Sequence, residues 1–171
     1  LKINPNNIKT YYNLGRAYED YYDLEFEKKY TQKTISRYFE EHKIEINSYK
    51  NAIDNYMMVI NYIRTDEDKL NRRETHLTNS LTANFSNEDM DARDKEYVIM
   101  AFKNLSRIYR NAGLYIDSKK FIEQAIKLDS ESHFAYVELA LLYRYTNDPE
   151  NALKSYMIAE KLSIDQPKAL T

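Results

Sequence analysis

Cysteine is absent from this chain of 171 residues. Its absence excludes disulfides, thiolate metal sites and a cysteine nucleophile. It leaves the compartment open, because cysteine-free proteins occur in the cytosol and in the periplasm alike. The abundance of Asn, Lys, Ile and Tyr is typical of an AT-rich genome. We therefore expect a bacterial protein on the cytoplasmic or the periplasmic side of the envelope.

Glycine and proline are scarce, with two and three copies. Isolated glycines cannot form a phosphate-binding loop, and the sequence contains no Gly-x-Ser-x-Gly elbow. The histidines His42, His76 and His133 are far apart and form neither an HExxH motif nor an i, i+4 pair. Glu40, Glu41 and His42 could bind a cation, but a solvated surface cluster is the favoured interpretation. We expect no catalytic site, no metal site and no cofactor.

Long apolar runs are lacking as well. None approaches the roughly 18 residues of a membrane-spanning helix, and no signal peptide is visible. A formal net charge of −2 and a pI near 6.0 provide no basic face for nucleic acid. With 43% hydrophobic and 30% charged residues, the composition is that of an ordinary globular domain with a substantial core.

What the sequence does contain is an internal repeat. Two sets of residues share one spacing and lie 34 positions apart. The first set is Phe102, Leu105, Ser106, Tyr109, Ser118, Ile122 and Ala125, and the second is Tyr136, Leu139, Ala140, Tyr143, Ala152, Tyr156 and Ala159. A fixed period between 20 and 50 residues indicates a repeat array. The alternative is a non-repetitive helical bundle with accidental spacing, which seven matched pairs disfavour.

This pattern resembles the tetratricopeptide repeat, whose unit is two antiparallel helices, A and B. The family's helix A carries aromatic-x-x-Leu-Gly-x-x-Tyr, and its helix B carries Ala-x-x-x-Phe-x-x-Ala. A third copy of the helix A pattern stands at Tyr11, Leu14, Gly15 and Tyr18. The resemblance implies an all-α, helical-repeat solenoid of antiparallel helix pairs with an irregular helical insertion. Residues 1–7 resemble the end of a preceding helix B, so we expect a piece of a longer protein.

The two glycines sharpen the match. Gly15 occupies the small position of helix A. Gly113 stands where the family turns from helix A to helix B, a place that suits a positive φ. Asn147, 34 residues later, is the next best residue for that conformation.

The periodicity also predicts helix boundaries. Helices are expected at 8–22, about 47–65, 86–111, 115–128, 133–145 and 149–162. The helix at 8–22 is capped by Asn6 or Asn7. The helix at about 47–65 is the best match to the helix B that pairs with it, through Ala52, Tyr56 and Val59. The bounds of the helices at 115–128 and 133–145 follow from the 34-residue register. Asp148 and Pro149 begin the last helix.

Between these helices the pattern is weaker. Residues 23–48 are interpreted either as an extension of the first helix or as an inserted helix, with Leu24, Ile35 and Phe39 packed on the repeats. Residues 66–85 are expected to be the most mobile part, as a linker or a short amphipathic helix. We expect one domain in four parts. These are a first repeat with insertion and linker at 1–98, two further repeats at 99–132 and 133–166, and the start of another element at 167–171.

The tyrosines divide into two groups. Seven occupy positions where the family places core aromatics: Tyr11, Tyr18, Tyr56, Tyr109, Tyr136, Tyr143 and Tyr156. Six others are open between packing on the insertion and contact with a partner: Tyr12, Tyr21, Tyr22, Tyr30, Tyr38 and Tyr145. Tyrosine suits both roles, because its ring can be buried while its hydroxyl stays wet.

The resemblance implies a concave groove lined by the A helices, which in the family holds an extended peptide or a partner's helix. Residues on the groove face of the three A helices are the candidate partner-binding set. They are Tyr12, Asn13 and Arg16, then Met100, Lys103, Asn104 and Arg107, then Phe134, Val137, Glu138 and Leu141. Asn13 and Asn104 precede the motif leucine, where family members often use Asn to hold a peptide backbone.

These residues predict a partner that is acidic at one end and apolar at the other. A family clamp for chaperone carboxylates is disfavoured, because Phe134 and Glu138 replace its cations. The leading hypothesis is a non-catalytic scaffold or adaptor that binds another protein through the groove or the inserted helices. The alternatives are a structural module that self-associates through exposed solenoid ends and, less favoured, an RNA-binding helical repeat.

Overall fold

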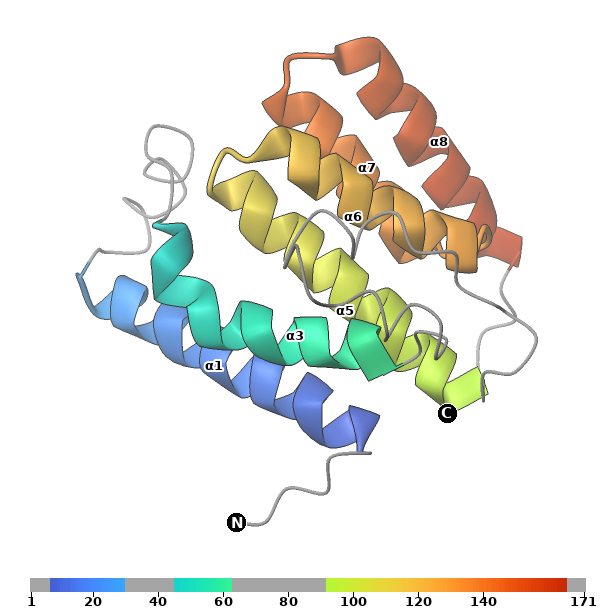
Figure 1. Cartoon of the computed structure of the whole chain (residues 1–171). Helices are drawn as coiled ribbons and strands as arrows, with labels where there is room; N and C mark the ends of the chain where they lie inside the picture. The colour runs from blue at the N-terminus through green and yellow to red at the C-terminus, as the bar shows by residue number, and fades with distance from the viewer. Residues whose placement is uncertain (1–6, 30–44, 63–91, 166–171) are drawn as a thin grey trace.

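The computed structural model describes residues 7–29, 45–62 and 92–165, and all regular structure in these ranges is helical (Figure 1). The elements are α1 (Ile8–Lys29), the short 3-10 helix η1 (Ile46–Tyr49), α3 (Lys50–Tyr62), α5 (Ala92–Asn111), α6 (Tyr115–Leu128), α7 (His133–Tyr145) and α8 (Pro149–Asp165). The predicted all-α class is therefore confirmed.

Three hairpins of helices follow one another along the chain. α1 packs on α3, α5 on α6 and α7 on α8, while α3 packs on α5 and α6 on α7 (Figure 1). Each hairpin thus contacts its sequence neighbour, as expected of a solenoid in which every repeat touches the next. α6 and α7 have the bounds that the periodicity predicted, 115–128 and 133–145.

The turns between paired helices repeat one hydrogen-bond pattern. Gly113 has φ 75° and Asn147 has φ 57°, both in the left-handed region that the sequence predicted. The amide after each one, at Leu114 and Asp148, donates to the carbonyl five residues back at 2.8 Å. The amides of Gly113 and Asn147 themselves donate three residues back, at 2.9 and 3.2 Å. This pair of bonds is the Schellman motif, which satisfies carbonyls at the helix end and reverses the chain.

Small residues set the spacing of the first hairpin. A Cβ at Gly15 would lie 2.6 Å from Cε1 of Tyr56, so only glycine allows α1 and α3 to approach this closely. The fully buried face of α3 carries Ala52, Tyr56 and Val59, and α3 packs on α1, as the sequence predicts for the helix B of a first repeat. Ala125 is also fully buried, in α6.

α1 continues past the predicted end near residue 22 to Lys29, as in the alternative that extends the first helix into residues 23–48. Asn7 caps it, with Oδ1 accepting from the amide of Thr10 at 3.1 Å. Leu24 is 56% exposed, so its predicted burial against the repeats is wrong. Ile35 and Phe39, the Ser86 start signal and the 66–85 linker lie outside the described residues.

Of the seven tyrosines expected in the core, Tyr56 and Tyr109 are buried and four are partly buried. The expectation is wrong for Tyr18, which is exposed. α1 is the first described helix, and its buried residues Ile8, Tyr12, Gly15 and Glu19 all lie on the stripe that faces α3 and α5. Tyr18 lies off that stripe.

Candidate functional site

The A helices enclose two adjoining pockets. The smaller has a volume of about 300 Å³ and is lined from three helices that are not consecutive in sequence. α1 contributes Arg16 and Asp20, α5 contributes Lys103, Asn104 and Arg107, and α7 contributes Phe134, Val137 and Glu138. No residue in the first two turns of α1 lines this pocket, and the first α1 residue that does is Arg16.

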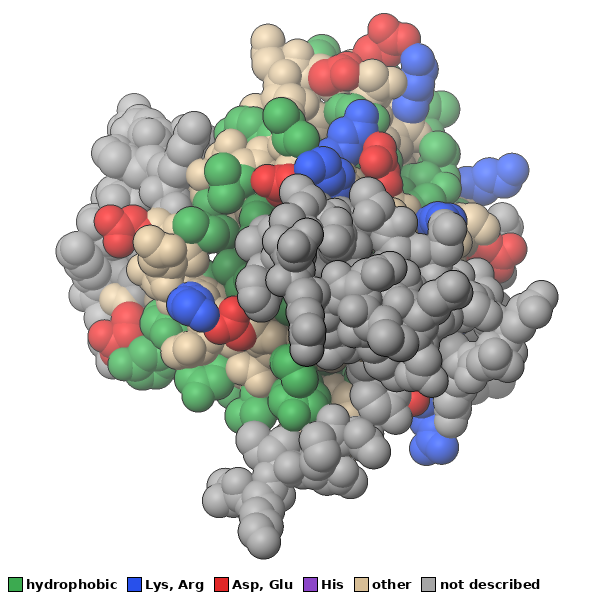
Figure 2. Space-filling view, viewed as in Figure 1, with side chains coloured by type: hydrophobic (Ala, Val, Ile, Leu, Met, Phe, Trp, Pro, Cys, Tyr) green, Lys and Arg blue, Asp and Glu red, His purple; other side chains and the backbone are tan. Residues whose placement is uncertain are grey.

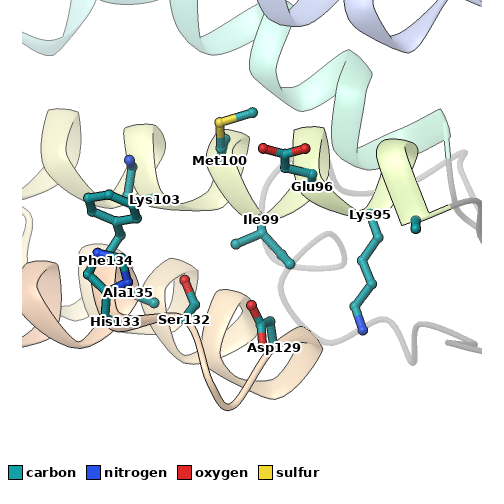
Figure 3. A pocket seen from close by; sticks show the side chains of 11 residues that line it. Lys95, Glu96, Ile99, Met100, Lys103, Asp129, Ser132, His133, Phe134 and Ala135 are labelled. Carbon is teal, nitrogen blue, oxygen red and sulfur yellow. The ribbon is translucent and has the colours of Figure 1, made fainter. Parts of the chain in front are cut away.

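The larger pocket, of about 640 Å³, continues toward the start of α5 and shares Lys103 and Phe134 with the smaller one. In Figure 3, α5 and the start of α7 form opposite walls, with Phe134 beside Lys103 and Ile99 between them and Asp129. Ile99, Met100 and Phe134 make the apolar part of the lining. The two pockets together are called the groove below.

Eight of the eleven candidate residues line this groove: Arg16, Met100, Lys103, Asn104, Arg107, Phe134, Val137 and Glu138. The register of the repeat therefore predicted which side chains from separate helices meet. Asn13 is exposed and Leu141 half-buried, and neither lines the groove.

Three candidates lie in the core, contrary to the expectation that groove residues stay outside it. Tyr12 is buried against the rings of Tyr56 and Tyr97, with ring centroids 5.9 and 5.4 Å away. Its hydroxyl donates to the sulfur of Met100 at 3.5 Å. The cause is the length of α5, which begins at residue 92 and places Tyr97 over Tyr12. Tyr12 is therefore packing, and the groove-surface role is wrong for it.

Asn104 and Glu138 are buried as well, although each lines the groove. The amide of Asn104 donates to the hydroxyl of Tyr56 at 3.0 Å, so it is occupied within the protein rather than free to hold a peptide backbone. The carboxylate of Glu138 accepts two bonds from Arg110, at 2.9 Å from Nε and 3.4 Å from Nη2. The guanidinium of Arg110 also lies 4.8 Å from the centroid of the Tyr145 ring.

A buried polar network lies under the groove and joins three helices. Glu19 of α1 is 1% exposed, and its carboxylate accepts from the hydroxyl of Tyr56 on α3 at 2.8 Å. The other carboxylate oxygen is ion-paired with Arg107 of α5, and Asn104 completes the network through Tyr56. Burial raises the pKa of Glu19, opposed by Arg107 and by the Tyr56 hydroxyl. Every polar atom taken from water is thus given a partner, as a buried network requires.

The sequence patterns did not predict this network. Glu19 and Tyr56 are separated by 37 residues and belong to different helices of an irregular repeat. The one available signal is a charged residue, Glu19, on the apolar stripe of α1 at four residues from Gly15. A charge in that position needs a buried partner.

Lys103 differs from the arginines around it. Arg107 is paired with Glu19 and Arg110 with Glu138, but Lys103 has no ion-pair partner among the residues that the structure describes. Its ammonium lies 5.1 Å from the centroid of the Phe134 ring. Burial lowers the pKa of Lys103, and the nearby Glu138 opposes that shift. Lys103 is thus a cation that the groove leaves available, as are Arg16 and Lys95, which also line it.

Within the described ranges, no three His, Asp or Glu side chains come together in a way that would hold a metal ion. The same part of the chain contains no helix that is long and apolar enough to cross a membrane.

The fold defines a class of protein, a solenoid of antiparallel helix pairs with a groove on the side of its A helices. Residues 104–132 and 135–163 each match the family model for the tetratricopeptide repeat, so these two segments are identified as tetratricopeptide repeats. Such repeats generally mediate protein–protein interaction. No curated protein matches the chain.

Proposed function

We propose that the chain is a non-catalytic scaffold or adaptor module that holds a segment of another protein in its groove. The observation that carries the proposal is the convergence of Arg16, Lys103 and Phe134 from α1, α5 and α7 on one concave surface. A family whose repeats generally bind proteins, and a groove lined from three repeats, support a protein segment as ligand.

The lining favours a segment with an acidic residue beside an apolar one. Lys103 offers a half-buried cation without a carboxylate partner among the described residues, and a ligand carboxylate would supply one. Phe134, at 60% exposure, presents its ring beside that ammonium, with Ile99 and Met100 behind it. Charge steers the encounter and apolar burial slows dissociation, so the two halves of the groove have separate kinetic roles.

The test uses a random twelve-residue peptide library displayed on phage and selected on the full chain. Selected peptides should contain Asp or Glu next to a large apolar residue. Lys103→Met should slow association, and Phe134→Ala should speed dissociation and weaken binding about 30-fold, the equivalent of about 2 kcal/mol for a buried anchor.

The chain offers a matched control in Lys119→Met. Lys119 lies on α6, with its ammonium 5.6 Å from the Tyr143 ring centroid, so it repeats the Lys103–Phe134 geometry outside the groove. Binding should be unchanged in that variant. Peptides that bind wild type, Lys103→Met and Phe134→Ala equally would show that the groove is not the site.

A second candidate function, self-association, is favoured by the outer surface of α8. Leu153 and Met157 are 61% and 60% exposed. One repeat earlier the same positions hold Lys119 and Glu123, an exposed pair 3.9 Å apart. Replacing Leu153 by Lys and Met157 by Glu transplants that pair onto α8. If α8 drives self-association, light scattering should show a mass that rises with concentration in wild type and stays monomeric in this double variant.

A further inference from the structure

The ion pair between Glu19 and Arg107 has a consequence for the groove that goes beyond holding helices together. Arg107 lines the groove and its side chain is 39% exposed, whereas Glu19 is buried and does not line it. The carboxylate therefore acts on the groove only through the guanidinium in front of it.

We infer that Glu19 is a positioning residue that sets the charge preference of the groove, because it holds Arg107 in an internal ion pair and so keeps Arg107 from joining the cations that can meet a ligand's negative charge, which are Arg16, Lys95 and Lys103. The inference rests on the proposed function, because it concerns the ligand of the same groove. It specifies a ligand segment with a single carboxylate at this point rather than a pair of acids.

The geometry supports this division of the cations. Tyr56 donates to one carboxylate oxygen of Glu19 and Arg107 pairs with the other, so the carboxylate is held from two sides. Asn104 in turn donates to Tyr56 and fixes the hydroxyl. Arg107 can engage a ligand only by giving up a charge-assisted bond to a buried acid, and an unpaired buried charge is strongly disfavoured.

The two arginines that follow Lys103 on α5, Arg107 and Arg110, are both ion-paired. Glu138, the partner of Arg110, itself lines the groove, whereas Arg110 is buried and does not. Arg16 and Asp20 are one turn apart on α1 and opposite in sign, and Asp20 raises the pKa of Arg16 after Tyr12. Each arginine of the groove thus has an acid near it.

The test measures binding of inorganic phosphate to the full chain by NMR titration at neutral pH, which needs no knowledge of the partner. Glu19→Gln keeps the shape and an acceptor for Tyr56 but releases Arg107. Phosphate should then bind about fivefold more tightly, with a steeper salt dependence, because Arg107 joins the cations that meet the anion. Glu19→Asp should restore the wild-type values.

Two further variants exclude a general change of charge or fold. Glu160→Gln removes the same charge from the exposed face of α8 and should leave phosphate binding as in wild type. The double variant Glu19→Gln with Arg107→Gln buries no unpaired charge, so it remains informative if the single variant fails to fold. It should also bind phosphate as wild type does.

Two results would overturn the inference: phosphate affinity unchanged by Glu19→Gln, or a loss of affinity in the double variant, which would mean that Arg107 already contacts anions. The selected peptides separate this inference from the proposed function. On Glu19→Gln, selection should enrich two acidic residues instead of one. If phosphate behaves as expected while selected peptides ignore Lys103, the groove charge is as inferred and the proposed protein-binding site is wrong.

Discussion

Single side chains decide how closely the first two helices approach. Gly15 lies against the ring of Tyr56, and that ring is itself held by Glu19 and Asn104. A ring bonded on both sides cannot turn away to admit a methyl group. The glycine was recognisable from its motif position, but the reason for it, a hydrogen-bonded tyrosine from another helix, was not.

Gly15→Ala should therefore lower the free energy of unfolding, although alanine is the better helix former. Overpacking a fitted core costs about 1–3 kcal/mol, against a gain in helix propensity of about 1 kcal/mol. Urea denaturation gives the difference. Asn13→Ala, on the exposed side of the same helix, has the propensity gain without the clash and should be slightly stabilising. Equal stabilisation by both changes would contradict the contact with Tyr56.

The titration of Glu19 provides a second prediction for a single side chain. Burial raises the pKa of Glu19 above its ordinary value. The groups that face it are Asp23 on α1, Tyr49 on η1, Tyr56 on α3, and Arg107 and Lys103 on α5. The folded chain holds this proton more tightly than the unfolded chain. Its contribution to stability is therefore complete below about pH 4.3 and is lost as the pH rises through the folded pKa.

The same titration should change anion binding. As the pH falls from neutral through the raised pKa of Glu19, its carboxylate becomes neutral and Arg107 becomes available to a ligand. Inorganic sulfate stays charged in this range and should bind wild type progressively more tightly. Every other ionisable group is common to the two proteins, so the effect assigned to Glu19 is the difference between wild type and Glu19→Gln. A difference that stays constant with pH would contradict this role.

Among the helices, α1 shows why the motif predicted correctly which residues share a helix face but not which of them are buried. Its register matches that of α5. However, α5 packs against α1, α3, α6 and α7, whereas the main contacts of α1 are with α3, α5 and η1. One-sided packing buries a narrow stripe, so Tyr18 is exposed although its equivalent Tyr109 is buried. Sequence spacing fixes which residues share a face, and the neighbouring helices decide which faces are covered.

The B helices allow a direct comparison of two equivalent positions. Ala125 of α6 and Ala159 of α8 are both buried, 34 residues apart. Replacing either by Leu should cost about 1–3 kcal/mol by overpacking, and Ala125 should cost more, because α6 is enclosed between α5 and α7 whereas α8 is packed on α7. Thermal or urea unfolding measures both. Unchanged stability in the two variants would contradict the common register.

For the whole molecule, the groove was predictable and its electrostatics were not. Periodicity placed Lys103, Asn104 and Arg107 on the face that meets Phe134, because equivalent residues of stacked repeats lie side by side. It could not show that Asn104 and Arg107 are already bonded to Tyr56 and Glu19, since those partners come from helices outside the regular repeats. A variant with Arg107→Glu, which sequence reasoning treats as a surface change, would face the buried Glu19 with a second carboxylate and should destabilise the fold.

Charges of both signs are mingled on the described part of the face in Figure 2. Local contacts join the hairpins at each junction. The first junction, between α1–α3 and α5, contains the network of Glu19, Tyr56, Asn104 and Arg107. The contact between α5 and α6 contains the buried pair Ser106 and Ser118, whose hydroxyl oxygens are 3.0 Å apart.

These two sites allow the cooperativity of the molecule to be tested. Tyr56→Phe removes one of the two donors to the buried Glu19 and the hydroxyl that accepts from Asn104, at a cost of about 1–3 kcal/mol. In a solenoid, where stability is roughly a sum of repeat and junction contributions, that loss should fall mainly on the first junction. Native-state hydrogen exchange should therefore show reduced protection in 8–29 and 50–62, with 115–165 little changed. Ser118→Ala, the control, removes a buried hydroxyl between α5 and α6 and should lower protection there instead. If Tyr56→Phe lowers protection equally from α1 to α8, the hairpins unfold as one unit and the network stabilises the whole chain.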